Sequence, residues 1–108
     1  MVTVENQNVD SVGASTRPKV AFSFDVEEHY RIEAALGLTC LSETKQEYAR
    51  RMEEATRWLL DAVNQSKGKS TFFIVGQIAK SHPQLIRDIA DSGHEIACHS
   101  WAHERIHR

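Results

Sequence analysis

Cysteine is scarce in this sequence, and its placement excludes two common uses of the residue. The chain has two cysteines, Cys40 and Cys98, which lie far apart and form no CxxC pair. Zinc knuckles and small disulfide-linked domains need closely spaced or more numerous cysteines. We therefore expect two free thiols, as is usual for proteins of a reducing compartment.

Long apolar runs and an excess of one charge are also missing. No run approaches the ~18 apolar residues that span a bilayer, and polar residues interrupt residues 1–18 too often for a signal peptide. A cytoplasmic location is therefore the default expectation. The chain has 13 Lys and Arg against 15 Asp and Glu, interspersed, with a formal net charge of -2. This balance does not indicate the excess of positive charge that typically binds nucleic acid or an anionic membrane surface.

What the sequence does contain is typical of one globular domain. Its 108 residues are 41% hydrophobic and 26% charged, which fits a single domain with a core. Residues 1–18 are polar and show no sustained periodicity, so we predict a flexible leader there. We expect the folded domain to occupy residues 19–108. The chain ends without a capping or turn signal, which is typical of a domain truncated at its C-terminus.

Hydrophobic periodicity predicts three strands and two helices. Short apolar runs at residues 20–24, 71–75 and 95–98 predict strands, and we expect the first two to be buried on both faces. A capping-box pattern at residues 44–47 predicts the start of the first helix. A helix over residues 83–90 begins with a proline and ends before a glycine. The apolar residues at helical spacing are Tyr48, Met52, Ala55, Leu59 and Ala62 in the first helix, and Leu85, Ile86, Ile89 and Ala90 in the second.

The order of these elements predicts an α/β fold. Strand, helix, strand, helix, strand implies right-handed crossovers and a parallel sheet with helices packed on it. Functional residues of such folds gather at the carboxyl ends of the strands. Acidic residues follow the first strand and histidines follow the third, so we expect both groups at one end of the sheet.

The histidines of the segment His99-Ser100-Trp101-Ala102-His103 form the first candidate site. On a helical turn, residues four apart share one face and can reach the same metal ion. A solvated helix face is the competing interpretation, but the pair directly follows a predicted buried strand, where an active-site loop would begin. His107 extends the same stripe, and we expect it at the surface.

The carboxylates Asp25, Glu27 and Glu28 form the second candidate site. They could cap the following segment. Three neighbouring carboxylates repel one another, however, and this arrangement is more favourable around a bound cation or where one of them acts as a base. Two histidines and one carboxylate would leave a zinc ion one open position for water, and a further carboxylate could accept the proton of that water. The predicted chemistry is hydrolysis of an amide or ester.

Three segments closely resemble the polysaccharide deacetylase family with its NodB homology domain. They are Phe22-Ser23-Phe24-Asp25-Val26-Glu27-Glu28, Ser70-Thr71-Phe72-Phe73-Ile74-Val75-Gly76, and Gly93-His94-Glu95-Ile96 leading into His99-Ser100-Trp101-Ala102-His103. The resemblance covers residues 19–107 in order. The TFFxxG and GHEIxxHSxxH segments are highly specific, and the DVEE variant is most similar to deacetylases linked to bacterial exopolysaccharide loci.

The resemblance assigns roles to individual residues. It implies that Asp25 is the general base and that His99 and His103 are metal ligands. The usual family motif has two adjacent aspartates followed by glycine, so Asp-Val-Glu-Glu departs from it. The third ligand is therefore Glu27 or Glu28, and related variants with an acid-x-acid spacing favour Glu27.

Neighbouring residues have weaker assignments. We expect Ser100 to orient the loop by hydrogen bonding and Cys98 to point away from the metal. Trp101 could face a sugar, but a place in the core is the favoured interpretation. His29 and Tyr30 could line the substrate cleft or belong to a plain loop.

The resemblance also implies a fold, a cofactor and a substrate. The family fold is a distorted (β/α)7 barrel, of which this chain would supply the N-terminal part. The implied reaction removes N-acetyl groups from an amino-sugar polysaccharide with a divalent metal, expected to be Zn²⁺. Small-amide hydrolysis and carbohydrate binding without turnover are the alternatives. The family's Arg-Pro and Leu-x-His segments follow the histidine motif, and neither follows it within residues 1–108; Arg17-Pro18 precedes the first motif. This chain alone is therefore expected to be inactive.

Overall fold

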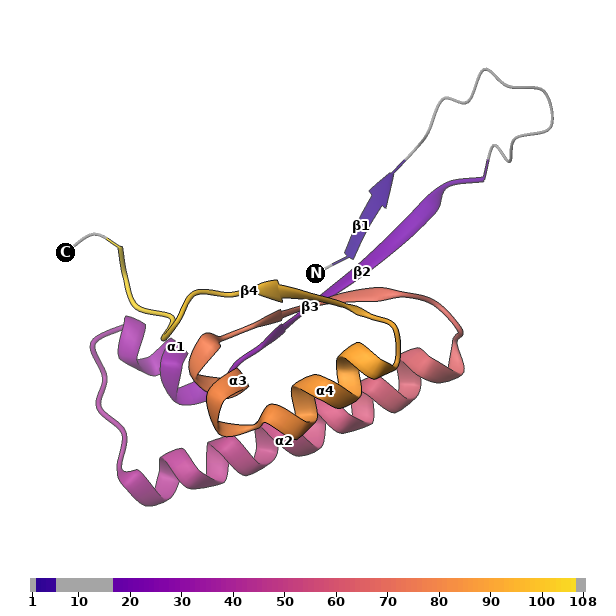
Figure 1. Ribbon diagram of the computed structural model, residues 1–108. Helices are drawn as coiled ribbons and strands as arrows, with labels where there is room; N and C mark the ends of the chain where they lie inside the picture. Colours follow the sequence, from indigo (N-terminus) through magenta and orange to yellow (C-terminus); the bar gives the residue numbers. More distant parts are fainter. Residues whose placement is uncertain (1, 6–16, 107–108) are drawn as a thin grey trace.

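The computed structural model describes residues 2–5 and 17–106, which form a four-stranded sheet with helices packed against it (Figure 1). The strands lie in the order β1-β2-β3-β4. Three of them, β2 (Lys19–Val26), β3 (Ser70–Ile74) and β4 (Glu95–Cys98), are parallel. These are the three predicted strands, with β2 two residues longer at its carboxyl end than expected. The α/β class and the parallel sheet are therefore confirmed.

Strand β1 (Val2–Glu5) was not expected. It pairs antiparallel with β2, from Val2 opposite Phe22 to Glu5 opposite Lys19. We predict a flexible leader there because residues 1–18 as a whole are polar and show no sustained periodicity. The backbone of β2 offers hydrogen-bonding groups along its edge, and a short strand can pair with them whatever its side chains. Residues 6–16 of the predicted leader lie outside the described residues.

The two long helices were predicted, with one error at a helix start. Helix α2 spans Ser42–Gln65 and helix α4 spans Pro83–Asp91. The capping box at residues 44–47 is wrong, because Leu41 is the N-cap and its carbonyl accepts the N–H of Lys45 at 2.9 Å. The end of α4 agrees with the prediction: Gly93 adopts φ +85° and its N–H donates to Ala90, as glycine does after a helix.

Two short helices follow strands directly and were missed. Helix α1 spans His29–Ala35 after β2, and helix α3 spans Gly76–Ser81 after β3. Helix α1 has seven residues and helix α3 has six. Such short helices do not show enough apolar periodicity to be recognised from sequence. Within the described residues no helix combines the length and the apolar character that crossing a membrane requires.

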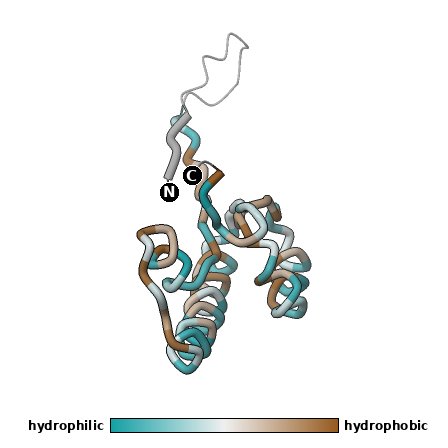
Figure 2. Tube along the Cα trace, turned by 90° about the vertical axis from the view of Figure 1, so that its left-hand side faces the viewer, coloured by the Kyte–Doolittle hydropathy of each residue, from teal (hydrophilic) through white to brown (hydrophobic). Residues whose placement is uncertain are grey.

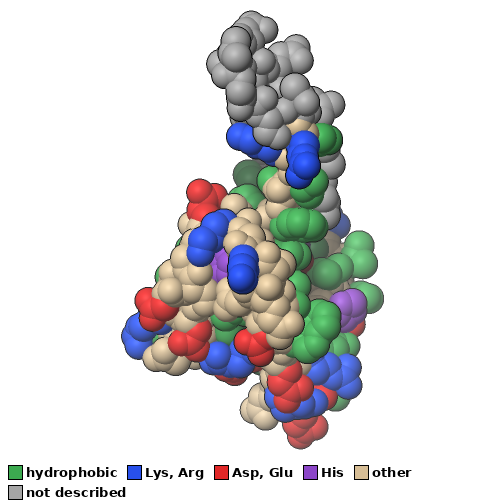
Figure 3. Space-filling view, turned by 90° about the vertical axis from the view of Figure 1, so that its right-hand side faces the viewer, with side chains coloured by type: hydrophobic (Ala, Val, Ile, Leu, Met, Phe, Trp, Pro, Cys, Tyr) green, Lys and Arg blue, Asp and Glu red, His purple; other side chains and the backbone are tan. Residues whose placement is uncertain are grey.

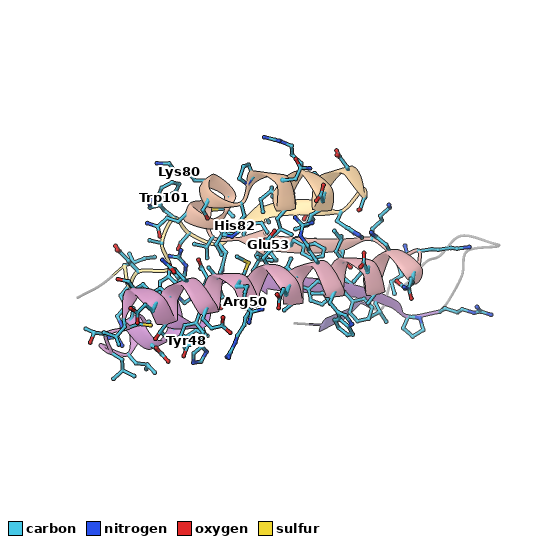
Figure 4. All side chains as sticks on the ribbon, turned by 90° about the horizontal axis from the view of Figure 1, so that it is seen from below. Tyr48, Arg50, Glu53, Lys80, His82 and Trp101 are labelled. Atoms are coloured by element: carbon cyan, nitrogen blue, oxygen red, sulfur yellow. The ribbon has the colours of Figure 1, made fainter. Side chains whose placement is uncertain are left out.

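The core lies between the sheet and the helices. Helices α2 and α4 lie on the same side of the sheet (Figures 1 and 4), and Figure 2 shows hydrophilic and hydrophobic residues alternating along the helices, as expected for amphipathic elements. The most deeply buried side chains are Phe72, Ile78, Leu85, Ile89 and Val75. They come from β3, α3, α4 and the residue that joins β3 to α3. The core therefore holds the carboxyl end of β3 in place, and the predicted functional residues lie at this end of the sheet.

The prediction that β2 and β3 are buried on both faces is wrong. On β3, Ser70, Phe72 and Ile74 are buried, whereas Thr71 and Phe73 on the other face are half-buried. Among the described residues the helices cover only one face of the sheet. The opposite face therefore keeps partial exposure, and alternate residues of each strand lie on it.

Strand β2 becomes buried only toward its carboxyl end. Val20 and Phe22 are 52% and 46% exposed, whereas Val26 is 3% exposed. The first half of β2 runs beyond the helix layer to pair with β1 (Figure 1), and hydrophobic side chains are visible at the surface along this part of the molecule (Figure 3). The packed end of the strand is thus the end that carries the acidic residues.

His94 connects the starts of β3 and β4 to helix α2. Its ring is 6% exposed, its Nδ1 accepts the backbone N–H of Ser70 at 3.1 Å, and its Nε2 lies 2.7 Å from Oδ1 of Asn64. Because Nδ1 must accept, the proton sits on Nε2 and donates to Asn64. The arrangement needs a neutral ring. Burial, and to a smaller extent the charge of Lys69, hold the pKa of His94 below its ordinary value of 6.5.

We expect this lowered pKa to make the protein less stable in mild acid. Between the lowered folded pKa and the ordinary value near 6.5, the unfolded state binds more protons than the folded state, so stability rises with pH through this window. Replacing His94 with glutamine, which keeps an acceptor and a donor, should make the loss of stability from pH 7 to pH 5 shallower. Urea unfolding of the metal-free complete protein at a series of pH values measures this effect. An H94Q variant with the wild-type pH slope would contradict it, and His82→Gln is the control.

Candidate metal centre

One acidic residue and two histidines converge at the carboxyl ends of the parallel strands. Oε2 of Glu27 lies 3.6 Å from Nε2 of His99 and 3.2 Å from Nε2 of His103. Each of the three residues offers one ligand atom, and these atoms lie within 4.8 Å of one another. No other three His, Cys, Asp or Glu side chains in the described part of the chain form such a group. The structure therefore brings together the two clusters that the sequence analysis expected to meet.

Backbone hydrogen bonds between neighbouring strand ends set this geometry. Glu27 directly follows β2 and His99 directly follows β4, with β3 between them. The N–H of His99 donates to the carbonyl of Ile74 at 3.0 Å, and the N–H of Val75 donates to the carbonyl of Val26 at 3.4 Å. The three strands thus end at one level, which places their following side chains in a common region.

The two histidines are not on a helical turn, which corrects the sequence prediction. Ser100 and His103 adopt the left-handed region at φ 57° and 60°. The N–H of Gly76 donates to the carbonyl of Ser100 at 2.9 Å, and the N–H of Gln77 donates to the carbonyl of Trp101 at 3.0 Å. These two carbonyls are therefore not available for the hydrogen bonds of a helix. A turn instead brings the rings of His99 and His103 to 4.9 Å between centroids.

Ser100 closes this turn. Its Oγ accepts the backbone N–H of His103 at 2.7 Å. The side chain replaces a backbone carbonyl as the acceptor, which is a common role of serine in turns. The predicted role of Ser100 in orienting the loop is therefore confirmed.

Three polar atoms of the cluster are buried without a hydrogen-bond partner among the described residues. They are Oε2 of Glu27, Nε2 of His99 and Nδ1 of His103. Leaving such a group unsatisfied costs about 1–3 kcal/mol. A divalent cation would satisfy this donor set, because two imidazoles and a carboxylate are the protein ligands of many catalytic zinc sites. The residues present therefore fit a metal ion.

Glu28, the alternative third ligand, is engaged elsewhere. It is 4% exposed, its Oε2 is bonded to Nε of Arg31, and its Oε1 accepts Nη2 of Arg31 at 3.3 Å. Both of its oxygens therefore have a buried cationic partner. Glu27, not Glu28, lies with the two histidines, which is the choice that the sequence analysis favoured. Arg31 itself was missed, because nothing in the pattern of a single arginine indicates burial.

Asp25 lies next to the triad in sequence but outside it. It occupies the penultimate position of β2, opposite Phe73, and its side chain is exposed. Neighbouring residues of a strand point to opposite faces, so Asp25 lies on the face opposite to that of the buried Val26. Its role as base stays a prediction.

The remaining residues differ in part from expectation. Trp101 is 59% exposed, so its predicted place in the core is wrong; the tight turn of its segment keeps it at the surface, where its ring edge covers Gly76. Cys98 is exposed, and both cysteines are free. His29 pairs with Glu33 at 3.4 Å. Tyr30 lines a cavity of about 760 Å³ beside His103, and His107 lies outside the described residues.

Replacing Gly76 with alanine should disturb the centre without touching a ligand. A Cβ there would lie 2.5 Å from Cε3 and 3.3 Å from Cα of Trp101, so the backbone between the two histidines must shift. We expect a loss of about 1–3 kcal/mol in the free energy of unfolding, as for other overpacked sites, together with weaker zinc binding. Thermal melts with and without zinc measure both effects. Gly68→Ala is the control, because its nearest atom is Oγ of Ser66 at 3.4 Å; equal behaviour of the two variants would contradict the prediction.

Comparisons with known proteins agree with these features. Residues 13–108 match the family model described as polysaccharide deacetylase. A chitooligosaccharide deacetylase of Sinorhizobium fredii is 42% identical over 45 residues, which are 42% of this chain and 21% of that protein. A peptidoglycan-N-acetylglucosamine deacetylase of Bacillus cereus is 36% identical over 53 residues, 49% of this chain and 19% of that protein. Chitin deacetylase 1 of Cryptococcus neoformans is 38% identical over 51 residues, 47% of this chain and 11% of that protein.

These matches cover only a small part of each relative. The aligned residues span about a fifth of the length of the Sinorhizobium and Bacillus proteins and less of the Cryptococcus protein. No solved structure matches the chain significantly. The family model, however, covers nearly all of the described residues and includes Glu27, His99 and His103. The chain therefore belongs to the polysaccharide deacetylase family.

Proposed function

We propose that the protein is a metal-dependent hydrolase that removes N-acetyl groups from an amino-sugar polysaccharide, and that residues 19–108 are part of its catalytic domain. The observation that carries the proposal is the convergence of Glu27, His99 and His103 with unsatisfied buried donor atoms. The names of the similar proteins, which specify chitooligosaccharides, peptidoglycan and chitin, support the substrate class.

The residues divide the chemistry between them. Glu27, His99 and His103 would hold the cation, for which zinc is the proposed identity because of its preference for imidazole and carboxylate. When bound, such a cation polarises a carbonyl oxygen and lowers the pKa of water toward ~7. Asp25 would accept a proton from the attacking water. The carbonyl carbon gains a bond to oxygen and loses its bond to nitrogen, and the nitrogen gains a proton, so the products are acetate and a free amine.

The activity can be tested on the complete protein that carries this chain. We expect zinc-loaded protein to release acetate from N-acetylated chito-oligosaccharides, to lose this activity with a chelator, and to regain it when zinc is returned. Peptidoglycan fragments, exopolysaccharide with N-acetylated sugars and small amides serve as the comparison substrates. Acetate release from the small amides alone would replace the proposal with small-amide hydrolysis. Absence of release from every N-acetylated glycan, with zinc bound, would refute it.

A further inference from the structure

Arg31 is a buried cation that the proposed reaction does not use. It lies in α1, and its side chain is 5% exposed. Its Nε and Nη2 are bonded to the two carboxylate oxygens of Glu28, which is 4% exposed. A buried ion pair of this kind adds little net stability, because taking both charges out of water costs about as much as their attraction returns. Its presence beside the metal centre therefore calls for another explanation.

The third nitrogen of Arg31 reaches two other segments. Its Nη1 donates to Oε1 of Gln77 at 2.7 Å and to the carbonyl oxygen of Ala102 at 3.3 Å. Gln77 belongs to α3, which follows β3, and Ala102 belongs to the loop that follows β4. One planar guanidinium thus joins the segments that follow all three parallel strands. A lysine could not do this, because it has no fork of donors in fixed directions.

Two of these contacts are one residue away from metal-ligand candidates. Glu28 is the neighbour of Glu27, and Ala102 is the neighbour of His103. His103 adopts the left-handed region at φ 60°, an unfavourable conformation for a residue with a side chain. Its backbone N–H is held by Ser100 and the preceding carbonyl is held by Arg31. The position of the His103 ring relative to Glu27 therefore depends on these two contacts.

We propose that Arg31 is a positioning residue of the metal centre, which holds Glu27 and His103 at ligand distance through Glu28 and the carbonyl of Ala102. The proposal rests on the metal centre described under the proposed function. It differs from a purely structural role in one measurable way. Loss of a structural contact lowers stability equally with and without metal, whereas loss of a positioning contact lowers the affinity of the folded protein for the metal.

The test compares Arg31→Lys with wild type in the complete protein. Zinc affinity is measured by competition with a chromophoric chelator, and the metal-free protein is melted to confirm cooperative folding. We expect the zinc Kd to rise about 10- to 100-fold, the usual effect of removing a group that orients metal ligands. Arg57→Lys is the matched control: Arg57 pairs with Asp88 at 2.8 Å and with Glu53 at 3.1 Å and is 41% exposed, so its zinc Kd should not change.

A second variant covers the case in which Arg31→Lys does not fold. Gln77→Leu leaves the buried pair of Arg31 and Glu28 intact and removes the shorter of the two bonds of Nη1, which helps to hold this nitrogen beside the carbonyl of Ala102. We expect its zinc Kd to rise about tenfold, at the low end of the same range. A folded R31K protein, or a folded Q77L protein if R31K does not fold, whose zinc Kd is within twofold of wild type would overturn the positioning role. Wild-type protein that binds no zinc would instead refute the metal centre, and zinc binding without acetate release would refute only the proposed reaction.

Discussion

Replacing His103 with alanine should abolish tight zinc binding by the complete protein, with a zinc Kd at least about 100-fold above that of wild type. Groups that only orient metal ligands contribute 10–100-fold, and a direct ligand is expected to contribute more. Removal of the ring leaves Glu27 and His99 with no third protein ligand among the described residues. Acetate release should fall with zinc occupancy. Competition with a chromophoric chelator gives the affinity, and metal analysis after dialysis gives the content.

Two further variants make this result specific. His82→Ala is the control, because His82 joins α3 to α4 and lies outside the triad, with its Nε2 3.7 Å from Oε2 of Glu53 in α2 (Figure 4). Its zinc Kd should equal that of wild type. Glu27→Gln should lose zinc as His103→Ala does, because the amide carries no charge. Wild-type zinc affinity in H103A or E27Q would remove that residue from the ligand set.

The strands and the long helices were predictable because each has a long or distinct pattern. Strand β3 is a run of β-branched and aromatic residues, and α4 carries a proline at its start and a glycine after its end. Strand β1 was not predicted because it lies in a stretch that is polar as a whole. Helices α1 and α3 were not predicted because six or seven residues do not complete the apolar periodicity of a helix. Their positions depend on packing against elements distant in the sequence.

The choice between Glu27 and Glu28 shows where sequence reasoning ends. Adjacent residues at the end of a strand point in opposite directions, but the sequence does not say which direction leads to the histidines. The structure resolves this through Arg31, which is buried with Glu28 and bonded to Gln77, 46 residues away. A pairing over that distance cannot be inferred from one sequence.

The turn between the histidines was the larger error. A spacing of four predicts a shared helical face, and the same spacing also allows a turn that brings the rings together. What decides between them is the pair of hydrogen bonds from Gly76 and Gln77 to the loop. The structure thus brings the three predicted ligand candidates together, but through a turn and not through a helix.

Replacing Asp25 with asparagine should lower kcat by about 10²- to 10⁴-fold, the usual contribution of a general base, while the zinc Kd stays within a few-fold of wild type. The change removes a proton acceptor and keeps the shape of the side chain. Asp25 is not one of the three residues whose atoms could share an ion, so metal content should be preserved. Acetate release at saturating substrate measures kcat, and metal analysis of the same sample measures zinc.

The pH profile separates this role from a structural one. A base that accepts a proton must be ionised, so the acidic limb of the wild-type kcat profile should be altered in D25N. A residue that only supports the fold would lower kcat by the same factor at every pH. Asp61→Asn, at an exposed position of α2, is the control and should retain full activity. Turnover by D25N at the wild-type rate would exclude Asp25 as the base and leave the metal centre in place, because the two depend on different side chains.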